Sequence, residues 1–162
     1  MAYREGTVLK HEIAFFAQIE AEGAYTRISK GVTDMSGSLN PTIETTQYIG
    51  ESTKTQTATA YEPTLTFTAE RYGLDDFNDR MYEIGRDQLL NQEVPMIVRV
   101  DLSDPGDSEN VFKATAAKYK VSIDSNDTGA AGAKVGFTGT LSQVGEIIKG
   151  TFNISTNEFT AE

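Results

Sequence analysis

A threonine-rich segment with a period of two is the feature that most constrains the fold of this chain. Residues 33–60 contain eight threonines and three serines but only five large apolar side chains. Four of the threonines recur at every second position: Thr53, Thr55, Thr57 and Thr59. Successive side chains of an extended chain point to opposite faces, so this pattern predicts a strand that is polar on both faces. Because neither face could cover a hydrophobic core, we expect residues 33–60 to be an arm that projects from a single domain, residues 1–162.

Gly50 lies in the middle of this arm and predicts a turn, which would fold residues 42–49 back onto residues 53–60 as a hairpin. An isolated hairpin is only marginally stable in water, so this one needs a partner. We expect it to pair with another subunit by β-augmentation, in which main-chain groups of two chains form a common sheet. The predicted contact residues are the apolar anchors and the alternating threonines: Ile43, Tyr48, Ile49, Thr53, Thr55, Thr57 and Thr59. The alternative is a disordered loop.

Most of the remaining chain alternates apolar and polar residues, which is typical of β-strands. Strands are predicted in seven segments: residues 11–19, 25–32, 63–72, 96–102, 111–123, 135–141 and 144–154. In the fifth segment the apolar positions change from even to odd numbers, which predicts a bulge or bend near Ala117. A small polar loop is expected at residues 124–132.

One helix is predicted, because Phe77, Met81 and Ile84 form a single apolar stripe and Asp75 or Asp76 can cap its first turn. Many strands and one helix predict a mainly β fold, a sandwich or barrel with one flanking α-helix.

The composition points away from catalysis and from nucleic-acid binding. Fourteen basic and twenty-four acidic residues give a net charge of -10, which disfavours a surface that grips phosphate groups. The chain has no cysteine and one histidine, His11, which we expect to be structural or exposed. No apolar run approaches the roughly 20 residues of a membrane-spanning helix, and the N-terminus lacks the pattern of a signal peptide. We therefore expect a soluble protein made in a cytoplasm, with no enzymatic activity, no cofactor, no metal and no membrane partner.

Four stretches of sequence, taken in order, carry a resemblance to a known family. They are residues 37–41 (GSLNP), 44–51 (ETTQYIGE) and 61–67 (YEPTLTF), and the capped helix with its YEI sequence at 82–84. In this order of elements the chain resembles the tail tube proteins, also called major tail proteins, of long-tailed bacteriophages, and among these the non-contractile, siphovirus type.

The resemblance implies a β-sandwich subunit with one helix, of which six close into a ring around a continuous inner β-barrel. Rings would stack into a hollow tail tube, the conduit for DNA ejection. It also implies that a long loop after the second strand reaches a neighbouring subunit or ring. The implied partners are other copies of the chain, the tape-measure protein and DNA inside the tube without sequence-specific binding, and the tail terminator and distal tail proteins. The implied location is the tail of a virion, and the host cytoplasm before assembly.

Other functions stay open at the level of sequence. A small β-barrel or sandwich that binds a ligand or sugar without catalysis is the main alternative, and an enclosed apolar pocket would favour it. A hydrolase that uses the aspartates of its turns is a further one. Within the structural class, a tail terminator or a capsid decoration protein would share many of these features.

Overall fold

The computed structural model describes residues 5–162, so the first four residues of the predicted domain lie outside the described part. The structure is mainly β, as predicted, with one α-helix, α1 (Asp76–Arg86), and a short 3-10 helix, η1 (Lys10–Glu12). The strands are β1 (Ile13–Gln18), β2 (Tyr25–Arg27), β3 (Val32–Ser38), β4 (Pro41–Thr46), β5 (Thr55–Tyr61), β6 (Thr64–Glu70), β7 (Gln92–Pro105), β8 (Val111–Thr128), β9 (Gly136–Asn153) and β10 (Glu158–Ala161).

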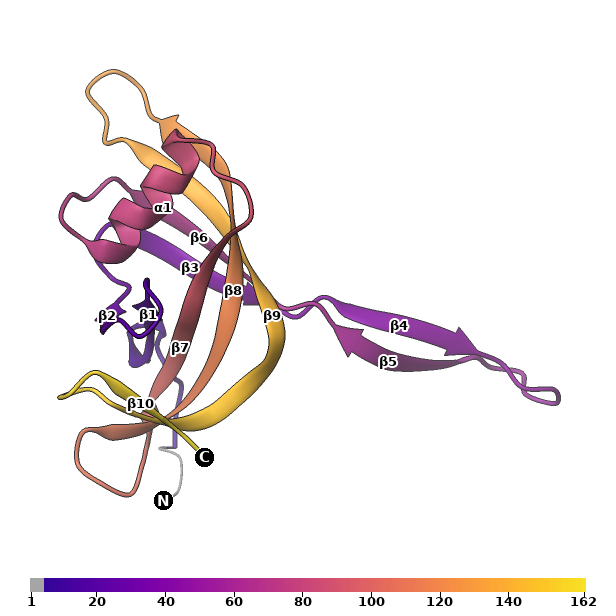
Figure 1. Cartoon of the computed structure of the whole chain (residues 1–162). Helices are drawn as coiled ribbons and strands as arrows, with labels where there is room; N and C mark the ends of the chain where they lie inside the picture. Colours follow the sequence, from indigo (N-terminus) through magenta and orange to yellow (C-terminus); the bar gives the residue numbers. More distant parts are fainter. Residues whose placement is uncertain (1–4) are drawn as a thin grey trace.

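Eight strands form one antiparallel sheet in the order β2-β1-β7-β8-β9-β6-β3, with β10 paired to the second half of β9. Figure 1 shows this sheet curled into a half barrel, with α1 at one end and a separate ribbon, β4 and β5, projecting from the body. Curling brings β1 and the β3–β6 pair to the same concave side. Phe15 of β1, Met35 of β3 and Phe67 of β6 accordingly belong to one buried core.

The central strands bury opposite faces at their two ends, because a bulge reverses the alternation. Tyr119 and Val121 of β8 lie in the main core, whereas Ala114 and Ala116 lie in a second core on the other face, around Phe152. The pairing of β8 with β9 shifts register between Ala116 and Lys118. The bulge predicted near Ala117 is therefore confirmed.

The helix α1 closes one end of the main core. Phe77, Met81 and Ile84 are buried, and the side chain of Asp75 accepts a hydrogen bond from the backbone N–H of Asn78 at 3.0 Å. The predicted stripe and cap are thus confirmed. Asn78 itself is buried and its side-chain amide donates to the carbonyl of Glu70 at 2.8 Å, which ties the helix to the end of β6.

Three predicted boundaries are wrong. Residues 25–32 form the three-residue β2 and the start of β3, because the chain turns at Gly31, whose φ is 77°. β8 runs to Thr128, so the first half of the predicted loop 124–132 is strand. The predicted strands 135–141 and 144–154 are one continuous β9, in which the register shift beside Gly145 absorbs the change of phase.

The predicted start of the arm at Thr33 is also wrong. β3 pairs with β6 in the main sheet, and Met35 is only 4% exposed. One buried side chain in seven residues is enough to hold an edge strand on the sheet, since the main chain supplies the pairing. The part that leaves the body begins after Ser38.

Candidate assembly surface

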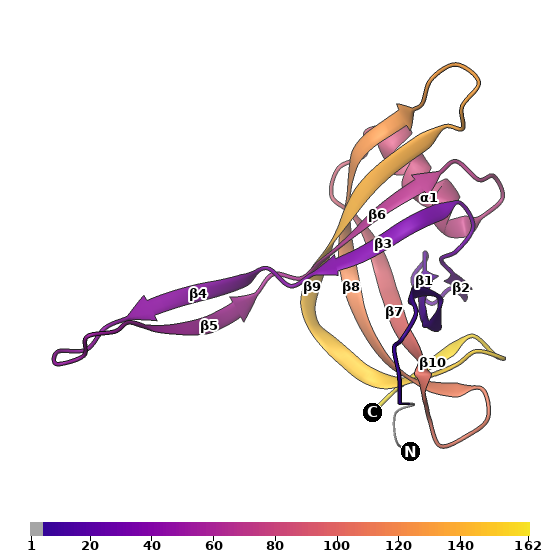
Figure 2. The same ribbon diagram turned by 180° about the vertical axis from the view of Figure 1, so that it is seen from behind.

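The arm is a two-stranded sheet of its own, formed by β4 and β5, and every residue in both strands is exposed. The antiparallel pairing runs from Pro41 opposite Tyr61 to Thr46 opposite Thr55, which confirms the predicted hairpin. Seen from behind, in Figure 2, the arm extends away from the curled sheet. It is therefore a surface that this subunit presents without covering it.

The junction between body and arm is held by hydrogen bonds. The N–H of Glu62 donates to the carbonyl of Leu39 at 3.0 Å, and the side-chain amide of Asn40 donates to the carbonyl of Glu62 at 3.0 Å. Asn40 has a φ of 45°, in the left-handed region that asparagine tolerates better than most residues. These hydrogen bonds connect the β3–β6 pair to the β4–β5 pair across a short break in the strand pairing. They fix the direction in which the arm leaves the body.

A bulge in β5 gives the arm one apolar and one polar face. Thr42 pairs with Ala60 and Ile43 pairs with Ala58, so Thr59 is an extra residue between them. Residues directly opposite each other in a sheet share a face, and alternate pairs share the same one. One face therefore carries Pro41, Ile43, Thr45, Gln56, Ala58 and Tyr61, and the other carries Thr42, Glu44, Thr46, Thr55, Thr57 and Ala60. The sequence pattern missed this, because an extra residue in β5 leaves no mark on the threonine spacing.

The tip of the arm, residues 47–54, is a hydrogen-bonded turn with apolar side chains at its apex. The N–H of Glu51 donates to the carbonyl of Tyr48 at 3.1 Å, and Gly50 has a φ of 94° that favours glycine. Tyr48 is about two-thirds exposed and Ile49 is fully exposed. A hydrophobic side chain held at the apex of an ordered turn is a feature of contact sites.

The seven predicted contact residues are all exposed but do not form one cluster. Ile43 lies in the middle of β4, and Tyr48 and Ile49 lie at the apex of the tip. Thr53 precedes β5, Thr55 and Thr57 share the polar face, and Thr59 is the bulge residue. The four threonines therefore do not make one continuous row, and their role in contacts stays a prediction.

A groove at the base of the arm was not predicted. Two adjoining cavities make it up, an inner one of about 380 Å³ and an outer one of about 1050 Å³. Both are lined by Leu39, Pro63, Thr64, Gln143 and Ile147. We call this the arm-base groove. Leu39 and Ile147 are at least half exposed, so the groove is open to the surface. The sequence signal that could have indicated the groove is the group of apolar residues Val144, Ile147 and Ile148, which the structure leaves exposed.

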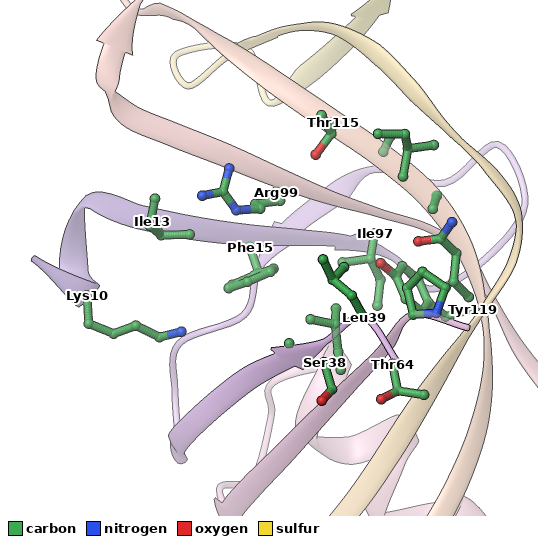
Figure 3. Close-up of a pocket in the computed structure, with 17 residues that line it drawn as sticks. Lys10, Ile13, Phe15, Ser38, Leu39, Thr64, Ile97, Arg99, Thr115 and Tyr119 are labelled. Atoms are coloured by element: carbon green, nitrogen blue, oxygen red, sulfur yellow. The ribbon is translucent and has the colours of Figure 1, made fainter. Parts of the chain in front are cut away.

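The inner cavity is the open end of the concave interior of the sheet. Phe15, Ile97 and Tyr119 form apolar walls, and Figure 3 shows Lys10 and Arg99 on the side away from Tyr119. The ammonium of Lys10 donates to the carbonyl of Met35 and lies 5.6 Å from the centre of the Phe15 ring. Among the residues that the structure describes, no hydrogen-bond or ion-pair partner is found for the guanidinium of Arg99.

His11 is exposed in η1. Within residues 5–162 no group of three histidine, aspartate or glutamate side chains is placed to hold a metal ion, and no helix is long and apolar enough to cross a membrane.

The similarity of this chain to known proteins lies in its structure. No protein-family model matches the chain, and no curated protein sequence matches it. A chain in the tail of an empty gene transfer agent particle, with C6 symmetry, is 14% identical with a TM-score of 0.64, over 96% of this chain and 100% of that one. A chain in the virion of a native gene transfer agent particle is 13% identical with a TM-score of 0.61, with the same coverage.

A third match comes from the sheath/tube terminator of an extracellular contractile injection system, PVC, in the extended state. It is 13% identical with a TM-score of 0.54, over 90% of this chain and 97% of that one. Identities this low show a common fold, and they do so over nearly the whole length of each chain. This chain therefore shares its curled, mainly β fold with chains of a gene transfer agent tail and of a contractile injection system.

Proposed function

We propose that this chain is a structural tail tube protein that self-assembles into hexameric rings, which stack into a hollow tube. The observation that carries the proposal is the fold match along 96% of this chain to a chain in a tail with C6 symmetry. A match confined to one sheet would be compatible with many unrelated β proteins. A match that includes all of the tail chain supports the same architectural role by analogy of fold.

The projecting arm supports assembly as the purpose of this fold. An exposed hairpin with an apolar face and an apolar tip gains little stability inside one subunit, but it can contribute contact area between two subunits. In the proposal Ile43, Tyr48 and Ile49 are anchors in such contacts, and Thr53, Thr55, Thr57 and Thr59 are polar contacts around them.

The proposed tube is a conduit for DNA in the tail of a virion, built from subunits that wait in the host cytoplasm. The net charge of -10 supports passage without adhesion, because like charges along the lumen repel phosphate groups. The proposed partners are the tape-measure protein, the tail terminator and the distal tail proteins. The chain has no catalytic task in this proposal.

For the tail type, we propose the non-contractile, siphovirus type. This part rests on the resemblance in the sequence, since the fold is shared with chains of contractile injection systems. The neighbouring genes test it, because a contractile tail needs a gene for a sheath protein beside the tube gene. A sheath gene there would contradict the non-contractile type and leave the tube proposal intact.

Electron microscopy of the purified chain at rising concentration tests the main proposal. We expect rings or tubes with six-fold symmetry. Monomers at every concentration, including in the presence of the terminator and distal tail proteins, would refute it. A ligand-binding module is less well supported, because the groove at the arm base is open, whereas pockets for small ligands bury most of the ligand surface.

A further inference from the structure

The tip of the arm and the arm-base groove have complementary shapes. The tip presents Tyr48 and Ile49 outward from a hydrogen-bonded turn. The groove presents an apolar cavity of about 380 Å³, within the range that accommodates a small organic ligand and large enough for two such side chains. The tip is exposed, and so are Leu39 and Ile147 at the rim of the groove, so burying them against each other would remove apolar area from water.

Their charges are complementary as well, and in a matching order. The tip carries one acid near its apex, Glu51, and one base further back, Lys54. The groove carries Lys10 and Arg99 in its inner cavity and Glu62 and Glu146 in its outer cavity. A tip that enters apex first would bring Glu51 toward Arg99 and leave Lys54 near Glu146. An unpaired guanidinium beside an apolar wall is well suited to bind a carboxylate from a partner.

The two surfaces cannot meet within one subunit. The eight residues from Asn40 to the apex are largely extended, and an extended chain rises about 3.3 Å per residue, so the apex lies roughly 25 Å from the base. The arm also points away from the body in both views (Figures 1 and 2). A tip that fills the groove must therefore come from a second copy.

We propose that the arm-base groove of one subunit receives the arm tip of another, with Tyr48 and Ile49 in the inner cavity, Glu51 on Arg99 and Lys54 on Glu146. This inference rests on the proposed function and names the receptor of the arm within it. Tip and groove are different surfaces, so the contact is heterologous and passes from copy to copy in a ring or along a tube.

Engineered cysteines test the contact directly, because the chain has none of its own. Ile49→Cys is mixed with a size-tagged Ile147→Cys under assembly conditions and oxidised mildly, and the cross-linked pair is measured on a non-reducing gel. Leu39→Cys is a second groove position, since a disulfide forms only over a narrow range of geometries. The controls are Leu74→Cys and Leu90→Cys, which are 98% and 86% exposed in the wild-type chain and lie outside the groove.

We expect at least one groove position to cross-link with Ile49→Cys at a yield ten times or more that of either control. Equal yields in mixtures that electron microscopy shows to be tubes would overturn the tip-in-groove contact and leave the proposed function standing. If the wild-type chain forms no oligomer, the proposed function fails and this contact fails with it.

A charge exchange gives an independent readout. Glu51→Arg and Arg99→Glu should each raise the critical concentration for assembly about fivefold or more, because each loses one exposed ion pair and brings two like charges together. The double variant should return it to within about twofold of the wild type, because the pair is restored in the opposite sense. Purely additive effects in the double variant would overturn the pairing.

Discussion

Ile43 and Ala58 lie directly opposite each other in the arm, because the extra residue Thr59 shifts the register of β5. This pairing puts the apolar side chains of the arm on one face and most of its threonines on the other. An edge ribbon of this kind is soluble before assembly and still has an apolar surface for a partner.

The apolar face should therefore matter more for assembly than the threonine face. Ile43 is 50% exposed, and burying the rest of its side chain in a contact contributes about 1 kcal/mol. Ile43→Ser should raise the critical concentration for assembly about fivefold, measured by sedimentation or light scattering. Thr46→Ser, on the opposite face and outside the proposed contacts, is the matched control and should have little effect. The reverse order of the two variants would show that the threonine face makes the contact.

Removing the arm should abolish tubes and leave the body folded. Pro41 and Tyr61 are paired, so residues 42–60 can be replaced by Asn-Gly, which favours a two-residue hairpin turn. The deleted residues are all exposed and add no buried area, so the melting temperature should change by only a few degrees. Calorimetry and electron microscopy measure the two effects. Tubes of normal appearance from this variant would remove the arm from assembly.

Gly139 of β9 lies against the main core and should tolerate an added methyl group poorly. A Cβ there would come within 2.6 Å of the Phe67 ring and 3.0 Å of the side chain of Ile123. Gly139→Ala should destabilise the subunit by about 1–3 kcal/mol, the usual effect of overpacking a core. Urea unfolding measures it as a lower midpoint at an unchanged slope. Gly73→Ala is the control, since nothing lies within 4 Å of its added Cβ. Equal midpoints for the two variants would mean that the core has room.

The hydroxyl of Tyr82 should titrate abnormally. It donates to a carboxylate oxygen of Asp127 at 2.7 Å, and this hydrogen bond is the main reason that the pKa of Tyr82 is raised above its ordinary 10.0. Because only the protonated hydroxyl donates, the stabilisation is present below pH 10 and is lost as the pH rises through the raised pKa. Asp127→Asn should lower the pKa of Tyr82.

Carbon NMR of labelled tyrosines follows this titration, with Tyr82→Phe to assign the signal. Asp127 has a φ of 54°, which asparagine also tolerates, so the turn should survive the change. Asp124→Asn is the control, because that carboxylate accepts a hydrogen bond from Thr140 instead. An equal shift in both variants would point to a general effect of charge on Tyr82.

The sequence predicted those elements whose signal lies in a few neighbouring side chains. The apolar stripe and cap at Asp75 were sufficient for α1, and the change of apolar phase around Ala117 was sufficient for the irregular pairing of β8 with β9. β3 was missed because pairing to β6 through the main chain leaves only Met35 as a side-chain signal. That β9 is one continuous strand was missed, because a register shift inside a strand looks, in sequence, like the end of one strand and the start of another.

The candidate assembly surface, too, was predicted only in part from the sequence. Exposure of Ile43, Tyr48 and Ile49 followed from local sequence. The arm-base groove did not, because its lining combines residues of β1, β3, β6, β7, β8 and β9 with residues of η1 and of the arm junction, and only the curled sheet brings them together.

The way the arm is joined to the body also determines how it carries a mechanical load. β4 and β5 extend the β3–β6 pair, and all seven residues of β6 pair with β9. A pull along the arm would therefore act parallel to these strands and load their hydrogen bonds in shear, all at once, instead of opening them one after another. Such a joint is stiff. In a column of subunits linked through their arms, the hydrogen bonds of the main sheet would resist stretching.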